Sequence, residues 1–170
     1  MRILFSLDLL NYSDCDIPFV RPSARCIIIK NELIAVVYSQ KYDYYKFPGG
    51  GIEKNETPID ACIRETKEET GIIIESKDLS FYGIVKRKEK INENTLFIQD
   101  NYYYLVNRFN LTNMQNLDKY EQEEGFTLKF VSPSEMIDVN LNHSHGNTNQ
   151  TMLLRDAKIC ELLIKEGYIK

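Results

Sequence analysis

One segment of the chain carries the signals for both ends of a helix and two chemically different faces between them. Thr57 is a favourable N-cap, Pro58 suits the first helical position, and Gly71 is the residue type that most often ends a helix. These signals predict a helix over residues 58–70. At about 100° per residue, the two sides of that helix differ in character. One side holds the core-type residues Ile59, Cys62, Ile63 and Thr66, and the other holds Ala61, Glu65, Glu68 and Glu69.

The carboxylate side of this helix favours a bound cation. Glu65 precedes Glu68 and Glu69 by three and four residues, and like charges at this spacing repel by about 0.2–0.5 kcal/mol per pair in an isolated helix. Arg64 and Lys67 offset part of the repulsion. A hard divalent cation such as Mg²⁺ or Mn²⁺, which prefers oxygen ligands, offsets more of it. From the helix alone, a solvated acidic surface is the alternative interpretation.

The remaining sequence predicts one α/β layered domain over residues 1–170. A chain of 170 residues with 43% hydrophobic residues is long enough for one core and short for two. β-Branched and aromatic runs predict strands at residues 1–10, 26–29, 33–37, 72–74, 79–85, 95–98, 102–109 and 126–131. Residues 86–94 are expected to form a charged, mobile connection. Helices are expected after the capping sequence at 132–135 and over about 149–165.

Charge and cysteine usage exclude several classes of partner. With 25 acidic and 21 basic residues the net charge is −4, which argues against a broad basic face for nucleic acid. No segment approaches the roughly 20 apolar residues that cross a bilayer, so no membrane partner is expected. The four cysteines form no C-x-x-C pair, which favours reduced thiols in a cytoplasmic protein. If the protein handles phosphates, something other than its own side chains must supply positive charge.

The sequence around the helix matches a longer pattern. From Gly50 the chain reads G-x5-E-x7-R-E-x-x-E-E-x-G, followed by an apolar residue, and Phe-Pro-Gly precedes it. This resembles the Nudix box of the MutT-like Nudix hydrolase family, over residues 50–72. A chance match to all seven fixed positions is on the order of one in a million. Thr66 departs from the bulky aliphatic residue of the pattern, and its place on the core side makes the departure a matter of packing.

The resemblance implies a fold and a set of site residues. The expected fold is a Nudix-type α/β/α sandwich with a mixed central sheet and a loop-helix-loop motif. Glu68 and Glu69 would ligate a divalent metal, with the carbonyl group of Gly49 contributing from the loop. Glu65 would ligate the metal or orient the attacking water. Arg64 would fix Glu65 by a charge-assisted hydrogen bond.

Further acidic residues have less defined expected roles. Glu53 and Glu56 either take part in the site or support the loop and the helix, and the sequence leaves both roles open. Many members of the family add a carboxylate from outside the box, and Glu121, Glu123 and Glu124 precede the strand at 126–131. Glu124 is the favoured ligand of the three because of its distance from Phe130 in that strand. A solvated run of charges is the alternative.

The expected reaction follows from the resemblance and the charge. The family hydrolyses a nucleoside diphosphate linked to another group X, and an acidic site binds a pyrophosphate only through bridging cations. X is left open among modified (d)NTPs, ADP-ribose, dinucleoside polyphosphates and nucleotide sugars. A Nudix-fold sensor that binds nucleotide or ADP-ribose without hydrolysis is the alternative function, and an interaction domain with an acidic helix face is a third.

Substrate contacts are assigned by residue type and position. Arg25 and Lys46 are candidates for contacting phosphates, and Phe47 is a candidate for stacking on a base. Each of these could instead belong to strand surface or core. The expected partner is a small-molecule nucleotide, with a homodimer left open.

Overall fold

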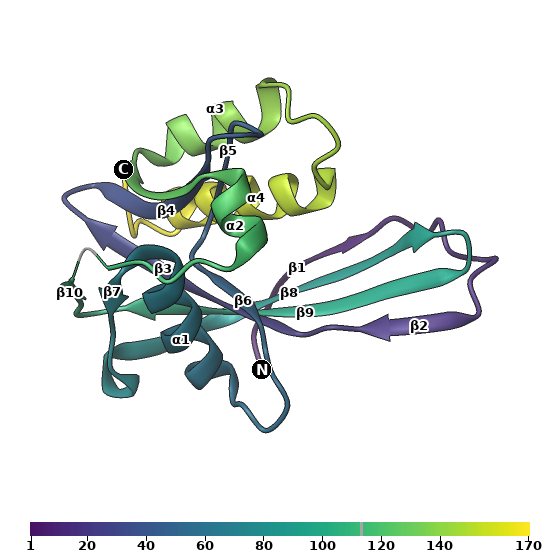
Figure 1. Ribbon diagram of the computed structural model, residues 1–170, viewed down its shortest axis with the longest axis horizontal. Coiled ribbons are helices and arrows are strands. Elements are labelled where there is room, and N and C mark those ends of the chain that lie inside the picture. Colours follow the sequence, from purple (N-terminus) through teal and green to yellow (C-terminus); the bar gives the residue numbers. More distant parts are fainter. Residues whose placement is uncertain (113) are drawn as a thin grey trace.

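The computed structural model, which describes residues 1–112 and 114–170, has a mixed sheet with helices on both sides (Figure 1). The strands are β1 (Ile3–Asp8), β2 (Ile17–Val20), β3 (Ser23–Lys30), β4 (Leu33–Ser39), β5 (Tyr44–Lys46), β6 (Gly49–Gly51), β7 (Ile72–Ile73), β8 (Leu79–Asn92), β9 (Thr95–Val106), β10 (Asn110–Leu111) and β11 (Phe126–Val131). The helices are α1 (Pro58–Thr70), the short 3₁₀ helix η1 (Ser76–Asp78), α2 (Lys119–Glu124), α3 (Pro133–Asn142) and α4 (Gln150–Lys165). Among the described helices, none is long and apolar enough to span a membrane.

The sheet combines parallel and antiparallel pairs. Its main path runs β1-β8-β9-β3-β4-β11, while β2 pairs with β9, β5 with β4 and β6 with β3. The β3–β9, β2–β9 and β1–β8 pairs are parallel, whereas β8–β9, β3–β6 and β4–β11 are antiparallel. A second, two-stranded sheet joins β10 to β7. The expected mixed central sheet is confirmed.

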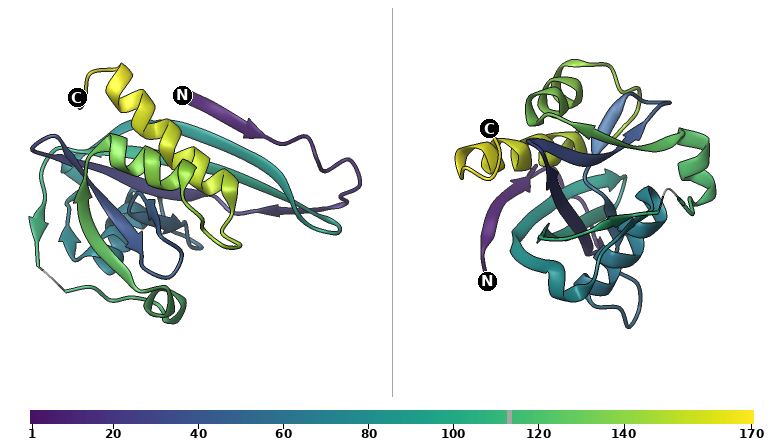
Figure 2. Two further views of the ribbon diagram at one scale, coloured as in Figure 1. Left: turned by 90° about the horizontal axis from the view of Figure 1, so that it is seen from above. Right: turned by 90° about the vertical axis from the view of Figure 1, so that its left-hand side faces the viewer.

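The helices cover the two faces of the sheet, and each face has its own core. In β3, Ile27 packs in the core that α3 and α4 share with the sheet. Its neighbours Cys26 and Ile28 point to the opposite face and pack in the core beneath α1. Successive residues of a strand alternate between faces, so a run of apolar residues in β3 serves both layers. Figures 1 and 2 show the resulting order of layers, with α3 and α4 on one side and α1 on the other.

The expected mobile connection at residues 86–94 is wrong. β8 continues to Asn92 and pairs with β9 almost to the turn, so the two strands form a long hairpin that projects from the rest of the molecule (Figure 1). Charged residues remain in the strand because they are paired inside it. Arg87 and Glu89 are buried and bind each other, and Arg87 also binds Gln99 of β9. The expected separate strands at 95–98 and 102–109 are likewise one strand, β9.

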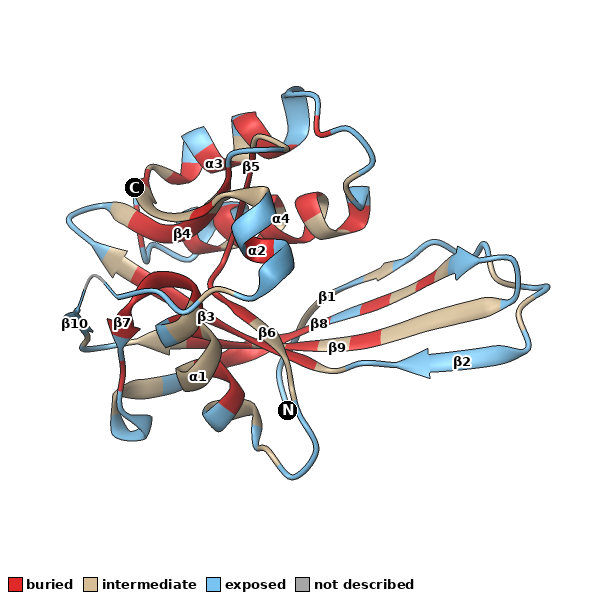
Figure 3. Cartoon of the chain, in the orientation of Figure 1, coloured by how far each residue is buried: buried red, intermediate tan, exposed pale blue. Residues whose placement is uncertain are grey.

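Helix α1 has the predicted bounds, but its buried surface is wider than predicted. Thr66 is fully buried, as its place on the core side requires. Ala61, which was expected on the carboxylate side, also lies in the core beneath α1, and Glu69 is buried at 1% exposure. Figure 3 shows α1 with buried, intermediate and exposed stretches. The carboxylate side is therefore partly covered, because the loop from β6 and the segment around α2 pack over the part that holds Glu69.

Candidate functional site

The site begins where a glycine loop meets the start of α1. The side chain of Thr57 accepts a hydrogen bond from the backbone N–H of Asp60 at 3.2 Å, and the Asp60 carboxylate accepts one from the backbone N–H of Thr57. This capping box fixes the first turn. The preceding strand β6 pairs with residues 23–25 of β3. Its glycines allow the helix to approach closely, since a Cβ atom on Gly50 would lie 2.6 Å from Oε1 of Glu65.

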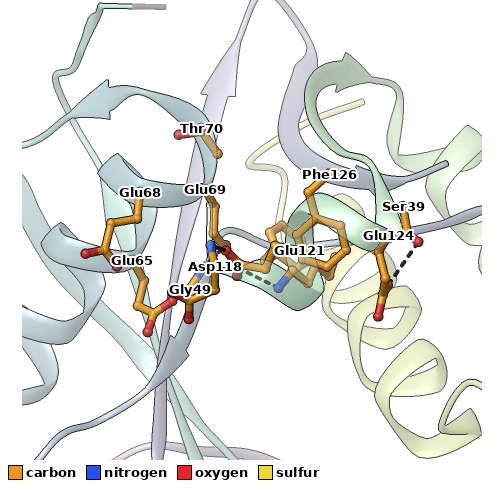
Figure 4. Close-up of polar contacts among 12 residues, drawn as sticks. Ser39, Gly49, Glu65, Glu68, Glu69, Thr70, Asp118, Glu121, Glu124 and Phe126 are labelled. Atoms are coloured by element: carbon orange, nitrogen blue, oxygen red, sulfur yellow. Dashed lines mark hydrogen bonds and ion pairs between the residues drawn. The ribbon is translucent and has the colours of Figure 1, made fainter. Parts of the chain in front are cut away.

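Three carboxylates converge beside this loop. One oxygen from each of Glu65, Glu69 and Glu121 lies within 4.8 Å of the other two. Glu65 and Glu69 come from α1, and Glu121 comes from α2 (Figure 4). Glu69 and Glu121 are buried at 1% and 4% exposure, where like charges are costly unless a cation compensates them. An all-oxygen set of this kind fits Mg²⁺ or Mn²⁺.

Arg64 holds the carboxylates of the helix and the loop in place. Its guanidinium donates to both carboxylate oxygens of Glu56, at 2.8 and 3.0 Å. It also donates to Glu65 at 2.8 Å and to Glu68 at 3.1 Å. The expected hydrogen bond from Arg64 to Glu65 is therefore present, and Glu56 supports the motif, one of the two roles left open for it. These bonds raise the pKa of Arg64, and the bond to Arg64 is also the largest cause of a lowered pKa for Glu56.

Glu69 is the most deeply buried carboxylate of the group. Its Oε1 accepts a hydrogen bond from Nζ of Lys46 at 2.5 Å, and its Oε2 accepts one from the backbone N–H of Gly49 at 2.9 Å. Burial raises the pKa of Glu69 to about 7, although the Lys46 ammonium acts in the opposite direction. Burial also raises the pKa of Glu68. The site is therefore short of positive charge even with Lys46 in place.

Two residues that were expected to contact the substrate, Lys46 and Arg25, bind other residues of the protein in this structure. Lys46 is buried against Glu69, with its Nζ 4.4 Å from the ring centre of Phe126. Arg25 is buried as well, and one of its nitrogens donates to the carbonyl groups of both Phe47 and Gly49 at 3.0 Å. Arg25 thus fixes the Gly49 carbonyl, which is the expected loop ligand. Both side chains reach the cleft described below, but their observed bonds hold the site together.

Phe47 cannot stack on a base in this structure. It is fully buried in the core shared with α3 and α4, and its ring meets that of Tyr103 edge to face at a centre-to-centre distance of 6.0 Å. Its expected substrate role is therefore corrected to a core role. The physical reason is the alternation of the chain before the glycine loop, which sends Lys46 toward the carboxylates and Phe47 into the opposite layer.

Glu124 lies apart from the three converging carboxylates. Its Oε2 accepts hydrogen bonds from the hydroxyl groups of Ser39 at 3.1 Å and Tyr44 at 2.9 Å. Figure 4 shows it on the far side of Phe126 from Glu65 and Glu69. Of the three carboxylates of α2, the structure brings Glu121 into the group and leaves Glu123 and Glu124 outside it.

A cleft of about 790 Å³ runs past these residues. Glu65 and Glu68 line it beside the glycine loop, Arg21 and Arg25 line it from β3 and the residues before it, and Tyr42 and Glu124 line it elsewhere. Ligand clefts in proteins commonly have volumes of about 300–1,000 Å³. The cleft is thus large enough for a nucleotide, with the carboxylates of Glu65 and Glu68 along one part of its wall.

Known proteins resemble this chain in sequence. A family model described as NUDIX domain matches residues 20–153. The chain belongs to the NUDIX family. It is 36% identical over 63 residues to an RNA pyrophosphohydrolase from Halorhodospira halophila, and 27% identical over 117 residues to one from Pseudomonas fluorescens. These matches cover 36% and 68% of the chain but only 34% and 65% of the relatives, so the chain spans less than two thirds of their length.

A solved structure shares the fold of this NUDIX chain. The NUDIX hydrolase from Nitrosomonas europaea superposes with a TM-score of 0.57 and 18% sequence identity. The match covers 83% of this chain and 90% of that one. At this identity the likeness concerns the fold, and it agrees with the expected α/β/α arrangement.

Sequence reasoning missed two residues that the structure places in the site. Glu121 was considered and not chosen, and Lys46 was assigned to the substrate. The signal for Glu121 is the sequence Asp-Lys-Tyr-Glu from residue 118, in which an N-cap and an acid three residues later form a capping box. That box predicts the short helix α2. The pairing of Lys46 with Glu69 has no local signal, because 23 residues separate them.

Proposed function

We propose that this NUDIX protein hydrolyses the pyrophosphate linkage of a nucleoside diphosphate joined to another group, and that it uses a divalent cation, Mg²⁺ or Mn²⁺. The observation that carries the proposal is the convergence of Glu65, Glu69 and Glu121 beside the glycine loop and the cleft. A polyphosphate meets strong repulsion from such a group unless cations lie between them. A divalent cation held by the carboxylates would therefore also offset the negative charge of the substrate's phosphates.

We assign Glu69 and Glu121 as ligands from their convergence, and Glu68 from its place in the Nudix box although it lies outside the converging group, with the Gly49 carbonyl completing the set. The cation, when bound, would neutralise the linkage and stabilise the charge that develops on the leaving phosphate. Glu65 receives the hydrogen bond of Arg64 on Oε1, and its Oε2 is then available to bind the cation or to orient the attacking water by accepting a hydrogen bond. Arg64 keeps this carboxylate at the fixed position that such orientation needs.

The proposed substrate is a small-molecule nucleotide derivative. The size of the cleft and the net charge of −4 support a compact ligand whose phosphates meet a cation. The relatives named RNA pyrophosphohydrolase make RNA with a 5′-triphosphate the macromolecular alternative. We also propose a cytoplasmic location, which the four free thiols support.

A substrate panel tests the reaction. It contains oxidised dNTPs, ADP-ribose, dinucleoside polyphosphates, nucleotide sugars and a 5′-triphosphate RNA oligonucleotide, each with Mg²⁺, with Mn²⁺ and with EDTA. We expect phosphate or mononucleotide release from at least one small molecule, abolished by EDTA. Turnover of the RNA alone would overturn the small-molecule assignment. Binding of a nucleotide without turnover of any compound would favour a sensor.

The metal assignment is tested by Mn²⁺ binding without substrate. We expect Glu121→Gln to weaken Mn²⁺ binding roughly 10- to 100-fold or more, since even residues that only support metal ligands contribute about that much. Glu124→Gln is the matched control, because it makes the same chemical change on the same short helix outside the carboxylate group. Titration calorimetry measures both. Equal losses for the two variants, or no loss for Glu121→Gln, would contradict the assignment.

A further inference from the structure

Glu124 lines the cleft but does not belong to the group of three converging carboxylates. Ser39 and Tyr44 both donate to its Oε2. In the part of the chain that the structure describes, no hydrogen bond reaches its Oε1. An ionised carboxylate can accept about four hydrogen bonds and can donate none. Glu124 therefore has one oxygen fixed by the protein and one oxygen left as an acceptor at the wall of the cleft.

The surroundings of Glu124 differ from those of the three converging carboxylates. Tyr44 and Phe126 belong to a small apolar cluster, against which Tyr42 and Met152 pack. All four of these side chains line the same cleft as Glu124. The rings of Tyr44 and Phe126 meet edge to face with centres 6.4 Å apart. Tyr44 and Phe126 are almost fully buried, so the half-buried side chains of Tyr42 and Met152 are the ones that offer apolar contact to a ligand next to this hydrogen-bond acceptor.

The chemistry of this wall suits the nucleoside half of a nucleotide better than the phosphate half. Phosphates are excluded from Glu124 by charge, and the proposed cation lies with the other carboxylates. A nucleoside has the complementary properties, since it has a flat ring for apolar contact and N–H or O–H groups to donate. The rigid position of Oε2, held by two hydroxyl groups, also fixes the direction in which Oε1 points. Such a preorganised acceptor discriminates between ligands that carry a matching donor and ligands that lack it.

We infer that Glu124 is a specificity-determining residue that accepts a hydrogen bond from the nucleoside half of the substrate, through an exocyclic amino group of the base or a ribose hydroxyl group. The inference rests on the proposed hydrolysis of a nucleotide and adds the residue that reads the nucleoside. Removing the ligand's donor leaves the half-buried carboxylate of Glu124 covered by the ligand but unpaired, which costs more than the absence of the bond alone. The discrimination should therefore be visible in kcat/KM.

Pairs of substrates that differ by one donor test this inference. The pairs are ATP and purine riboside triphosphate, GTP and inosine triphosphate, and ATP with its 2′-deoxy and 3′-deoxy forms. The first two pairs report on an amino group and the last two on a ribose hydroxyl group. We expect the wild-type protein to prefer the member with the donor by roughly 10- to 100-fold in kcat/KM in one pair, the value of a hydrogen bond to a charged acceptor.

Variants then assign that preference to Glu124. Glu124→Gln should reduce the preference to roughly threefold or less. Glu123→Gln is the matched control, since Glu123 is the exposed neighbour on the same helix, and it should keep the full preference. Ser39→Ala removes one donor to Oε2 and leaves Oε1 in place, so it should keep most of the preference if Glu124 acts through Oε1.

The outcomes separate this inference from the function on which it rests. Turnover by the wild-type protein with no preference in any pair, or with a preference that Glu124→Gln retains, overturns the inference and leaves the hydrolase intact. A preference that Glu123→Gln abolishes equally also overturns it. No turnover of any triphosphate or any compound of the broader panel overturns the proposed function, and the inference with it.

Discussion

Three consecutive glycines in β6 provide a graded test of how the loop positions the carboxylate group. A Cβ atom on Gly50 would lie 2.5 Å from the carboxyl carbon Cδ of Glu65 and 2.6 Å from its Oε1. Ordinary contacts of a Cβ atom begin at 3.4 Å. In Gly50→Ala, the Glu65 carboxylate must therefore retreat by about 0.9 Å, and because it ends a flexible side chain, it can do so without disturbing the backbone.

We expect Gly50→Ala to lose activity while it keeps its fold. A displacement of about 1 Å in a group that positions reactants can cost about 100-fold in rate, equivalent to about 2.7 kcal/mol. The free energy of unfolding should change by no more than about 1 kcal/mol, the usual scale of a Gly to Ala change at a tolerant position. Phosphate release measures the first effect, and urea-induced unfolding measures the second.

The neighbouring glycines supply the two controls. Gly49 has a φ of +136°, and a Cβ atom added to it would meet the Cα atom of Arg25 in β3 at 2.7 Å. Gly49→Ala should therefore lower the free energy of unfolding by roughly 2–6 kcal/mol. The Cβ atom of Gly51 would meet Nε of Arg21 at 3.1 Å, the end of a flexible side chain, so Gly51→Ala should keep turnover within about threefold of wild type. Wild-type turnover in Gly50→Ala, or a loss of stability equal to that of Gly49→Ala, would refute the reasoning.

Two further predictions concern buried ion pairs. Lys46→Met should lower the free energy of unfolding by roughly 3–5 kcal/mol, because it leaves Glu69 buried without its counter-charge. The double variant with Glu69→Gln should recover most of that loss in urea unfolding, and a failure to recover would show that packing of Lys46 matters more. Burial acts to raise the pKa of Asp156, but the Arg155 guanidinium outweighs it and holds that pKa below 3.8. Asp156→Asn should therefore lower the free energy of unfolding by roughly 3–5 kcal/mol at pH 7. The difference from wild type should shrink as the pH falls below 3.8, since protonation of Asp156 in the wild-type protein removes the same attraction. A difference in the free energy of unfolding that does not depend on pH would contradict this account.

Local signals determined the parts of the protein that are close together in sequence. The bounds of α1 follow from Thr57, Pro58 and Gly71, whose effects extend over one turn of helix. The contact of Arg64 with Glu65 and Glu68 is likewise fixed by helical spacing. The resemblance to the Nudix box rests on the same short range of sequence.

Local signals failed where charge or polarity was satisfied by distant partners. The charged residues of β8 suggested a mobile connection, yet Arg87 and Glu89 neutralise each other, and both form hydrogen bonds with the side chain of Thr151 at the start of α4. Ala61 was placed on the wrong side of α1 because the prediction assumed that the whole carboxylate side of the helix meets water. Here the loop and α2 cover part of the second face.

The sequence by itself determined the fold class, the position of helix α1 and the carboxylates on that helix. Only the tertiary structure decided which residues from elsewhere join them: Glu121 instead of Glu124, Lys46 as the partner of Glu69, and Phe47 as core. The physical reason is that these contacts depend on how strands and helices from separate regions pack. A difference of one residue along β5 and the loop after it sends a side chain to the opposite face of the sheet. A difference of three residues along α2 moves a side chain by about 4.5 Å along the helix axis, out of the carboxylate group.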